Sequence, residues 1–240
     1  MNKGLILSAL REGEMRLEGQ FVYGSNYTFL ASCQYDNQDF KVVYKPMEGE
    51  RPLWDFPSKT LAKREVAAYL VSQALGWSLV PPTVFRMRNA PMGPGSVQIY
   101  IDHDPEYHYF KFDEKERERF PWVMAFDLLI NNADRKGGHF LMDPEGKLWL
   151  IDHGLSFHVE DKLRTVLWDY AGQPVPQEVL SDIERLHRDL TNKNGLYQSL
   201  LPYLNQEEIE ALKLRAESLI NDLIFPLPPE ERRAYPWPLV

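Results

Sequence analysis

The sequence contains almost no cysteine, which limits both its covalent chemistry and the compartment that suits it. Cys33 is the one cysteine among 240 residues. A single thiol excludes a disulfide within the chain and is typical of proteins that work in a reducing compartment. We therefore expect a cytoplasmic location.

Long apolar runs and an excess of positive charge are missing as well. No stretch approaches the roughly 20 apolar residues of a membrane-spanning helix, and the apolar run Leu5 to Leu7 is too short for a signal peptide. The formal net charge of −8 argues against general nucleic-acid binding and against a basic surface for anionic membranes. We expect no integral membrane segment and no nucleic-acid partner, while the oligomeric state stays open.

The pattern of apolar residues predicts an α+β protein. The hydrophobic content of 44% in 240 residues suits one domain or two closely packed lobes. The first part of the chain alternates short strands with turns, and the later part is mostly helical. Strands are predicted at 15–23, 27–33, 40–45, 84–85 and 97–101, the first three as an antiparallel meander, and helices at 3–12, 60–75, 121–130, 177–190 and 205–224.

Polar residues with chemical potential are concentrated between 126 and 158, in FDLLINNADRKGGHFLMDPEGKLWLIDHGLSFH. Two short apolar runs, 140–142 and 148–151, flank the turn DPEGK and predict a hairpin. Asp134 precedes this hairpin and Asp152 follows it, so the two carboxylates can lie close in space. Asp152 also follows a buried-looking strand, where a carboxylate is costly unless it is paired or binds metal. Phosphoryl transfer needs one carboxylate for the attacking hydroxyl and one for Mg²⁺.

These motifs resemble those of the phosphatidylinositol 3/4-kinase-like superfamily. NADRKGGHFLM is similar to its catalytic loop, in which D-R-x-x-x-N precedes a strand, and IDHGLSF is similar to its metal-binding segment. Type II phosphatidylinositol 4-kinases look closest, and secretory-pathway casein kinases and HipA-type bacterial kinases look more distant. The whole chain also resembles a bacterial family described only as phosphatidylinositol-kinase-like. The resemblance is specific over residues 126–158, reaches back to residue 14, and is weak after 158.

The resemblance implies roles for the residues of the loop and hairpin. Asp134 would be the catalytic base or hydroxyl-orienting group, Arg135 would steady the loop or a phosphate, and Asp152 would bind Mg²⁺. His139 stands where the family usually has a metal-binding Asn, so its ring nitrogen would bind a second metal and favour Mn²⁺. Protons would then compete with the metal below a pH near the ordinary histidine pKa of about 6.5. The alternative is that the ring points away and hydrogen-bonds a loop carbonyl.

The phosphate-holding pair of the family is assigned to Lys45 and Glu65. Lys45 ends the strand FKVVYK, and Glu65 lies on the helix predicted at 60–75. A strand lysine paired with a helix glutamate fixes the ammonium group on the nucleotide phosphates.

Two further segments take the places of a phosphate-covering loop and an adenine-binding hinge. Ser25 and Asn26 belong to a turn that carries one glycine instead of G-x-G-x-x-G, although its N–H groups can still face phosphate. The strand at 97–101 leads into a polar connector, which in a kinase is the hinge. We therefore expect the adenine near Gln98 to Asp102, with Gln98, Ile99 and Tyr100 as contact residues.

The sequence thus predicts a two-lobed protein-kinase-like fold within one domain, 1–240. The N-lobe is expected at about residues 1–102 and the C-lobe at about 103–240. The expected activity is transfer of the γ-phosphate of ATP, with Mg²⁺ or Mn²⁺, to a hydroxyl of an unidentified protein, lipid or small molecule. Two alternatives stay open: a catalytically weak pseudokinase that binds nucleotide as a scaffold, and a nucleotidyl transferase on the same fold.

Overall fold

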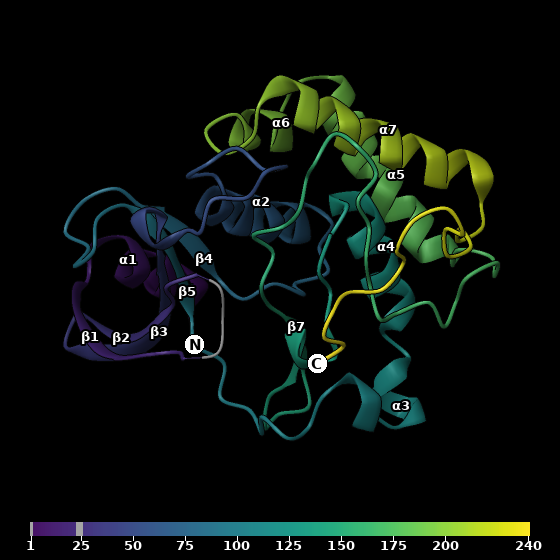
Figure 1. Ribbon diagram of the computed structural model, residues 1–240. Helices are drawn as coiled ribbons and strands as arrows, with labels where there is room; N and C mark the ends of the chain where they lie inside the picture. The colour runs from purple at the N-terminus through teal and green to yellow at the C-terminus, as the bar shows by residue number, and fades with distance from the viewer. Residues whose placement is uncertain (1, 23–25) are drawn as a thin grey trace.

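The computed structural model describes residues 2–22 and 26–240, and within them it has the two-lobed α+β architecture that the sequence predicts. In Figure 1 the sheet with α1 lies on one side of the molecule and α4, α5 and α7 lie on the other, with α2 between them. Among the described residues, no helix is both long and apolar enough to span a bilayer.

The described part of the N-lobe is built on a five-stranded antiparallel sheet. In spatial order its strands are β1 (Glu14–Gln20), β2 (Phe29–Tyr35), β3 (Gln38–Pro46), β5 (Gly95–Ile99) and β4 (Thr83–Arg86). The predicted meander is confirmed by the antiparallel pairing of β1, β2 and β3, although β1 ends at Gln20, earlier than expected. In β3 Val42 and Tyr44 are buried, and because side chains alternate along a strand, Lys45 points to the opposite face.

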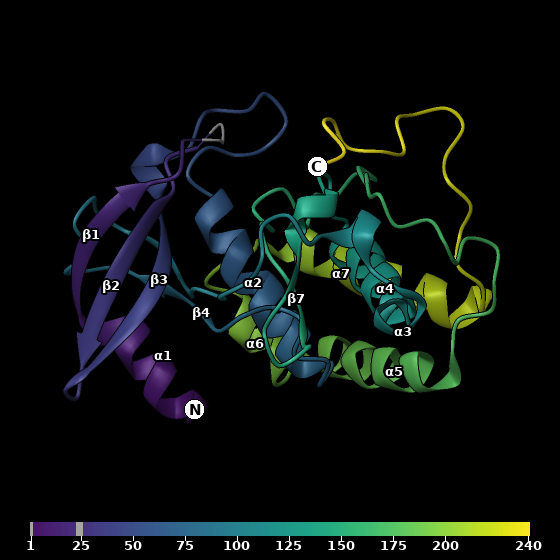
Figure 2. The same cartoon turned by 90° about the horizontal axis from the view of Figure 1, so that it is seen from below.

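Two helices pack on this lobe. α1 (Lys3–Glu12) buries Ala9 and Leu10 against the sheet, as Figure 2 shows from below. α2 (Leu61–Ala74) contacts β4, β5 and the later helix α6 (Leu196–Leu200). The first two N–H groups of α2, from Leu61 and Ala62, donate to the carboxylate of Glu50 at 3.1 and 2.8 Å. Glu50 therefore caps α2 from the preceding loop, where a negative charge also suits the helix dipole.

The C-lobe is mostly helical and carries a small hairpin. Its remaining elements are α3 (Glu114–Arg117), α4 (Phe120–Ile130), β6 (Phe140–Met142), β7 (Leu148–Leu150), α5 (Gln177–Thr191) and α7 (Gln206–Asp222). Short 3₁₀ turns lie at Met47–Gly49, Tyr109–Lys111 and Gly137–His139. The helices predicted at 121–130, 177–190 and 205–224 are confirmed to within a few residues, whereas α6 was not predicted because it is short and follows the unusual turn at Gly195.

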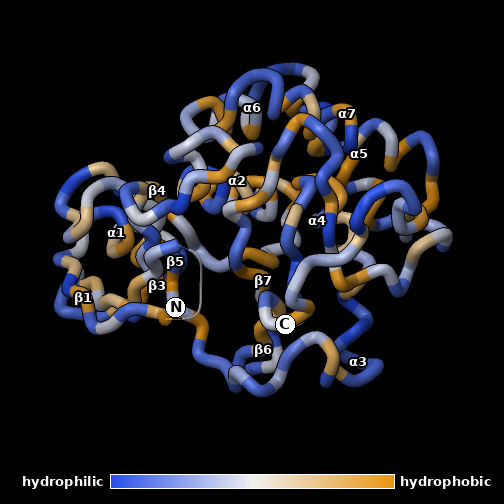
Figure 3. The backbone as a smooth tube through the Cα atoms, viewed as in Figure 1, coloured by the Kyte–Doolittle hydropathy of each residue, from blue (hydrophilic) through white to orange (hydrophobic). Residues whose placement is uncertain are grey.

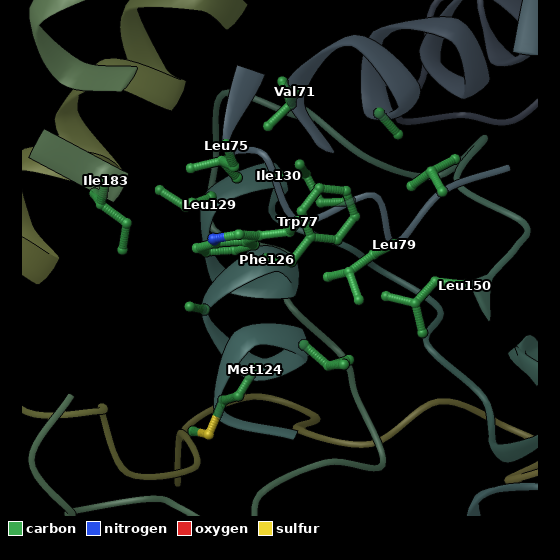
Figure 4. Close-up of a cluster of buried hydrophobic side chains, with 14 of the residues drawn as sticks. Val71, Leu75, Trp77, Leu79, Met124, Phe126, Leu129, Ile130, Leu150 and Ile183 are labelled. Atoms are coloured by element: carbon green, nitrogen blue, oxygen red, sulfur yellow. The ribbon is translucent and has the colours of Figure 1, made fainter. Parts of the chain in front are cut away.

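The larger hydrophobic core joins α2 to the C-lobe. Figure 3 shows apolar stretches in α2 and α4. Figure 4 shows Val71 of α2 and Leu75, directly after this helix, beside Leu129 and Ile130 of α4 and Ile183 of α5. A smaller core lies between α1 and the sheet. The division of the chain near residue 102 remains a prediction, because α2 precedes that boundary and yet packs into the larger core.

The last segment of the chain runs back across the C-lobe in an extended form (Figure 1). Its residue Ala234 accepts a hydrogen bond from Thr165 N–H at 3.1 Å, and Leu239 accepts one from Gly137 N–H at 2.7 Å. Gly137 has no room for a side chain, since a Cβ there would lie 2.8 Å from the ring of Phe110. The segment thus lies against the loop that holds Asp134.

Candidate active site

The predicted catalytic loop and hairpin are formed by the end of α4 and the strands β6 and β7. α4 ends at Asn131, which adopts a left-handed conformation with φ of 52°. β6 and β7 pair antiparallel, with Leu141 opposite Trp149. The turn between them is closed by Asp143, whose carboxylate accepts the N–H groups of Glu145 and Lys147 at 3.1 and 2.8 Å. The hairpin prediction is confirmed.

A fully buried ion pair holds the catalytic loop. Arg135 has 0% exposed surface and binds the carboxylate of Asp127, on α4, at 3.0 to 3.1 Å through Nε and Nη2. Its Nη1 donates to the carbonyl of Ile151 at 2.9 Å, which ties the loop to the end of β7. Because Arg135 is enclosed, it steadies the loop and does not reach a phosphate. Of the two roles expected for Arg135, contact with a phosphate is therefore corrected.

Asp127 and Asn132 fix the backbone around Asp134. The side-chain amide of Asn132 donates to Asp127 at 3.1 Å, and its oxygen accepts the N–H of Asp134 at 3.0 Å. Thr165 Oγ1, from the segment after the hairpin, donates to the same Asp127 carboxylate at 3.2 Å. The buried carboxylate of Asp127 therefore holds together α4, the loop at Asn132 and Arg135, and the segment at Thr165. Buried polar groups whose hydrogen bonds are all satisfied make a structure rigid in this way.

Asp134 itself is partly open to solvent. Its side chain is 28% exposed and lies 3.2 Å from Nζ of Lys136. Burial raises the pKa of Asp134, while Lys136 acts in the opposite direction and the nearby charge of Asp152 adds to the rise. Asp134 belongs to the loop before the hairpin and Asp152 to the segment after it, and Arg135 Nη1 joins the two segments through the carbonyl of Ile151. A raised pKa is what a carboxylate needs to accept a proton.

Lys45 joins the two lobes at the centre of the site. Its Nζ forms an ion pair with Oε1 of Glu65 on α2 and another, at 2.9 Å, with Oδ1 of Asp152. Burial lowers the pKa of Lys45, but Asp152 and Glu65 together raise it above its ordinary value. The charge of Lys45 in turn lowers the pKa of Asp152, which stays ionised. The predicted pairing of Lys45 with Glu65 is present, and Asp152 shares the same ammonium group.

A neutral histidine connects the buried ion pair to Glu65. The N–H of His153 donates to Oε2 of Glu65 at 2.9 Å, and its ring Nε2 lies 2.8 Å from Nη2 of Arg135. Because the guanidinium can only donate, Nε2 must accept and the ring proton is on Nδ1. Burial lowers the pKa of His153 well below its ordinary value, so the ring is neutral. Asp127, Arg135, His153 and Glu65 thus form one connected network that leads to Lys45.

His139 faces Asp152. Its Nε2 lies 3.5 Å from Oδ2 of Asp152, and its Nδ1 has a long contact of 3.4 Å with the N–H of Lys136. The ring therefore does not point away toward a loop carbonyl, which was the alternative to a metal ligand. Burial lowers the pKa of His139 to about 4, although Asp152 opposes the shift. The competition with protons expected near pH 6.5 is thus moved to a lower pH.

Asp152 and His139 have the chemistry of ligands for a divalent ion. The side chain of Asp152 is 52% exposed and carries a charge, and the backbone of this residue is left-handed with φ of 61°, a conformation that few residues other than glycine adopt. Within residues 2–22 and 26–240, no group of three or more His, Cys, Asp and Glu side chains is arranged to hold a metal. Two protein ligands still fit an ion completed by phosphates and water, which is the usual Mg²⁺ arrangement in phosphoryl-transfer enzymes.

The expected nucleotide-contacting residues are only partly placed. Ser25 lies outside the described residues, and the side chain of Asn26 accepts the N–H of Arg51 at 2.7 Å. Gln98 is buried and donates to Thr83 Oγ1 at 2.8 Å.

At the predicted hinge, the N–H groups of Ile99 and Tyr100 are already used. They donate within the sheet to the carbonyls of Pro82 and Lys41 at 3.0 and 2.9 Å. The position of the adenine within the stretch from Gln98 to Asp102 therefore stays a prediction.

Sequence reasoning missed the residues that support the site from beneath. Asp127 was treated as part of an apolar helix, although a lone carboxylate in FPWVMAFDLLI is itself a signal, because burying it requires a partner. His153 was assigned no role of its own beyond its place next to Asp152. Arg64, adjacent to Glu65, has no role in the sequence-based prediction, although its side chain is buried and 1% exposed.

Comparison with solved structures identifies the fold. The Golgi casein kinase, in a crystal structure with Mn/ADP bound, matches with a TM-score of 0.61 at 14% identity, over 99% of this chain and 80% of that chain. The proinflammatory kinase CtkA of Helicobacter pylori matches with a TM-score of 0.53 at 13% identity, over 90% and 94% of the two chains. The protein therefore has a kinase-like fold.

Comparison with curated sequences identifies the family. Protein Rv2133c of Mycobacterium tuberculosis is 38% identical over 266 residues, covering 96% of this chain and 94% of that protein. The chain belongs to the family of Protein Rv2133c. Phosphatidylinositol 4-kinase gamma 4 of Oryza sativa subsp. japonica is 30% identical over 151 residues, which cover 53% of this chain and 26% of that protein. No family model matches.

Proposed function

We propose that this protein is an ATP-dependent phosphotransferase of the phosphatidylinositol 3/4-kinase-like type that acts on a hydroxyl group. The observation that carries the proposal is the double ion pair of Lys45, which brings Glu65 of the N-lobe and Asp152 of the C-lobe onto one ammonium group. Asp134 lies nearby with part of its carboxylate in solvent. A phosphate clamp, a charged metal ligand and a proton acceptor are the parts that phosphoryl transfer requires.

In the proposed reaction Asp134 accepts the proton of the acceptor hydroxyl. The hydroxyl oxygen forms a bond to the γ-phosphorus, the bond from that phosphorus to the β,γ-bridging oxygen breaks, and ADP leaves with the bonding electrons. Lys45 holds the phosphates in line, and Glu65 keeps Lys45 in place. Burial of Asp134 favours proton transfer, because it raises the pKa of this carboxylate.

We assign Asp152 and His139 as the protein ligands of the divalent ion, Mg²⁺ or Mn²⁺. A bound ion offsets negative charge that builds up on the phosphates. The neutral ring of His139 beside the ionised Asp152 supports this assignment. Lys45, which now pairs with Asp152, would turn its ammonium group toward the phosphates when they enter.

The similarity to the plant phosphatidylinositol 4-kinase supports the superfamily assignment but does not define the acceptor. The matched region is about half of this chain and about a quarter of the plant protein. The negative net charge keeps nucleic acid out of the proposal.

The test is transfer of label from ATP. Wild-type protein and Asp134→Asn would be incubated with Mg²⁺ or Mn²⁺ and either α- or γ-labelled ATP, against separate protein, lipid and metabolite fractions. The proposal expects label from the γ position only, in one fraction, and only with the wild type. Label from the α position would show a nucleotidyl transferase, and nucleotide binding without any transfer would show a pseudokinase.

A further inference from the structure

We propose that Arg64 is a positioning residue that ties α2 to the C-lobe, so that Glu65 meets Lys45 before a nucleotide is bound. This inference rests on the proposed function, because it concerns the same phosphate clamp. It starts from two adjacent residues on α2 that face different partners. Glu65 pairs with Lys45 across the cleft, whereas Arg64 pairs with Glu208, at the start of α7 in the C-lobe.

The ion pair of Arg64 and Glu208 is buried on both sides. Arg64 is 1% exposed and Glu208 is 6% exposed. Breaking a buried pair of this kind is strongly unfavourable, because the remaining charge has no partner and no water. The attachment between α2 and α7 is therefore rigid, in contrast to a surface pair that forms and breaks freely.

Both partners make further contacts that fix the direction of the pair. Nη1 of Arg64 donates to the carbonyl of Ser156, in the segment that follows Asp152. The guanidinium also lies 5.0 Å from the ring centre of Phe56. The second carboxylate oxygen of Glu208 accepts the N–H of Asn205 at 2.9 Å, in the capping box of α7. Arg64 thus joins α2 to a helix terminus and to the metal-binding segment at once.

The consequence for Glu65 follows from its place next to Arg64 on a regular helix. A rotation or shift of α2 that moved Glu65 away from Lys45 would also pull Arg64 away from Glu208 and Ser156. The N–H of His153, which donates to Glu65, lies in the same segment as Ser156. The clamp of this protein is therefore held closed by contacts within the chain, and it needs no activating partner to bring α2 into place.

A second arginine offers a matched control. Arg185, on α5 of the C-lobe, donates to the carbonyl of Leu75 at 2.9 Å and so attaches the far end of α2. This contact is at the end of α2 remote from Glu65, and Arg185 belongs to no part of the proposed site. Arg185→Met removes a cross-lobe contact of α2 as Arg64→Met does, but it leaves the contacts around Glu65 intact.

The experiment compares Arg64→Met, Arg64→Lys and Arg185→Met by hydrogen exchange without nucleotide and by kinetics. Arg64→Met is expected to speed exchange in the peptide that contains the amide of His153. It should also lower kcat by about 10²-fold, since a shift of about 1 Å at a distance from the chemistry can cost that much. Arg64→Lys should restore part of the slow exchange and part of kcat. Arg185→Met should leave the exchange at His153 and kcat unchanged.

Two results would overturn the inference. One is an unchanged exchange rate at the amide of His153 in Arg64→Met. The other is a loss of kcat in both Arg64→Met and Arg185→Met that depends only on how far each variant's melting temperature falls. If Arg64→Met does not fold, Glu208→Gln breaks the charge pair while keeping an oxygen for the α7 cap, and the same readouts apply. If the wild type has no transferase activity, the proposed function fails, while the exchange measurement still tests Arg64.

Discussion

The buried half and the open half of the site use charged residues in opposite ways. Asp127 and Arg135 are fully enclosed and satisfy each other. Asp134 and Asp152 keep 28% and 52% of their side chains exposed, and their available partners are lysines. The first pair is fully used within the protein. Each carboxylate of the second pair can exchange its lysine for a proton or a metal ion, which leaves the ammonium group of that lysine for a phosphate.

This contrast explains why the pKa of each open carboxylate moves in its own direction. Burial dominates at Asp134 and raises its pKa, while the charge of Lys45 dominates at Asp152 and lowers its pKa. Two carboxylates whose pKa values are driven apart are suited to separate tasks, one as a proton acceptor and the other as a permanent negative charge. The buried network beneath them keeps both in place.

The largest effect is expected from breaking the buried half. Arg135→Met leaves Asp127 as an enclosed charge without its main partner, which typically costs about 3–5 kcal/mol of folding free energy. Urea unfolding measures this loss. The control is Arg16→Met on β1, where the ion pair with Glu14 is exposed to solvent and contributes little to stability. Equal losses in the two variants would show that the buried network does not support the fold as argued.

The next effect is expected in the open half, on turnover and not on stability. Asp134→Asn should keep ATP binding and lower kcat by about 10²-fold or more, the usual cost of losing a general base. Because the pKa of Asp134 is raised, it becomes protonated, and kcat falls, at a higher pH than for an ordinary carboxylate. Normal turnover by Asp134→Asn across this acid range would remove Asp134 from its assigned role.

The fold and the open residues could be predicted from the sequence because both leave local signals. Alternating apolar residues predicted the meander of β1, β2 and β3, and the DPEGK turn predicted the hairpin. Lys45 and Glu65 were assigned from the resemblance to the kinase superfamily, together with their places at a strand end and on a predicted helix. These signals depend on residues that are close in the sequence.

The buried half could not be predicted in the same way, because its partners are set by packing between distant segments. Arg64 and Glu208 are far apart in the sequence and lie on helices whose relative position no periodicity gives. The ring of His139 likewise took its lowered pKa from burial, which changed the pH dependence expected from its ordinary value. At the predicted hinge, the N–H groups of Ile99 and Tyr100 already donate to backbone carbonyls of neighbouring segments, which the sequence pattern did not indicate.

The smallest effect is expected at His139, on the choice of metal. His139→Asn should stay active. Its kcat/KM with Mn²⁺ divided by its kcat/KM with Mg²⁺ should be lower than in the wild type, since an amide oxygen is a harder ligand than a ring nitrogen. Because the pKa of His139 is about 4, its protonation should not affect the wild type above about pH 5. The same metal ratio in both proteins would mean that His139 is not a ligand.

The most direct test of the account is the stabilisation of the protein by ATP with Mg²⁺, measured as a shift in melting temperature. At a 100-fold excess over Kd, a ligand that binds the folded state adds about 2.7 kcal/mol. The account predicts a clear shift for the wild type and for Glu145→Ala, at the exposed tip of the hairpin, and no metal-dependent shift for Asp152→Ala. A wild-type melting temperature unmoved by ATP and Mg²⁺, or an equal shift in Asp152→Ala, would contradict it.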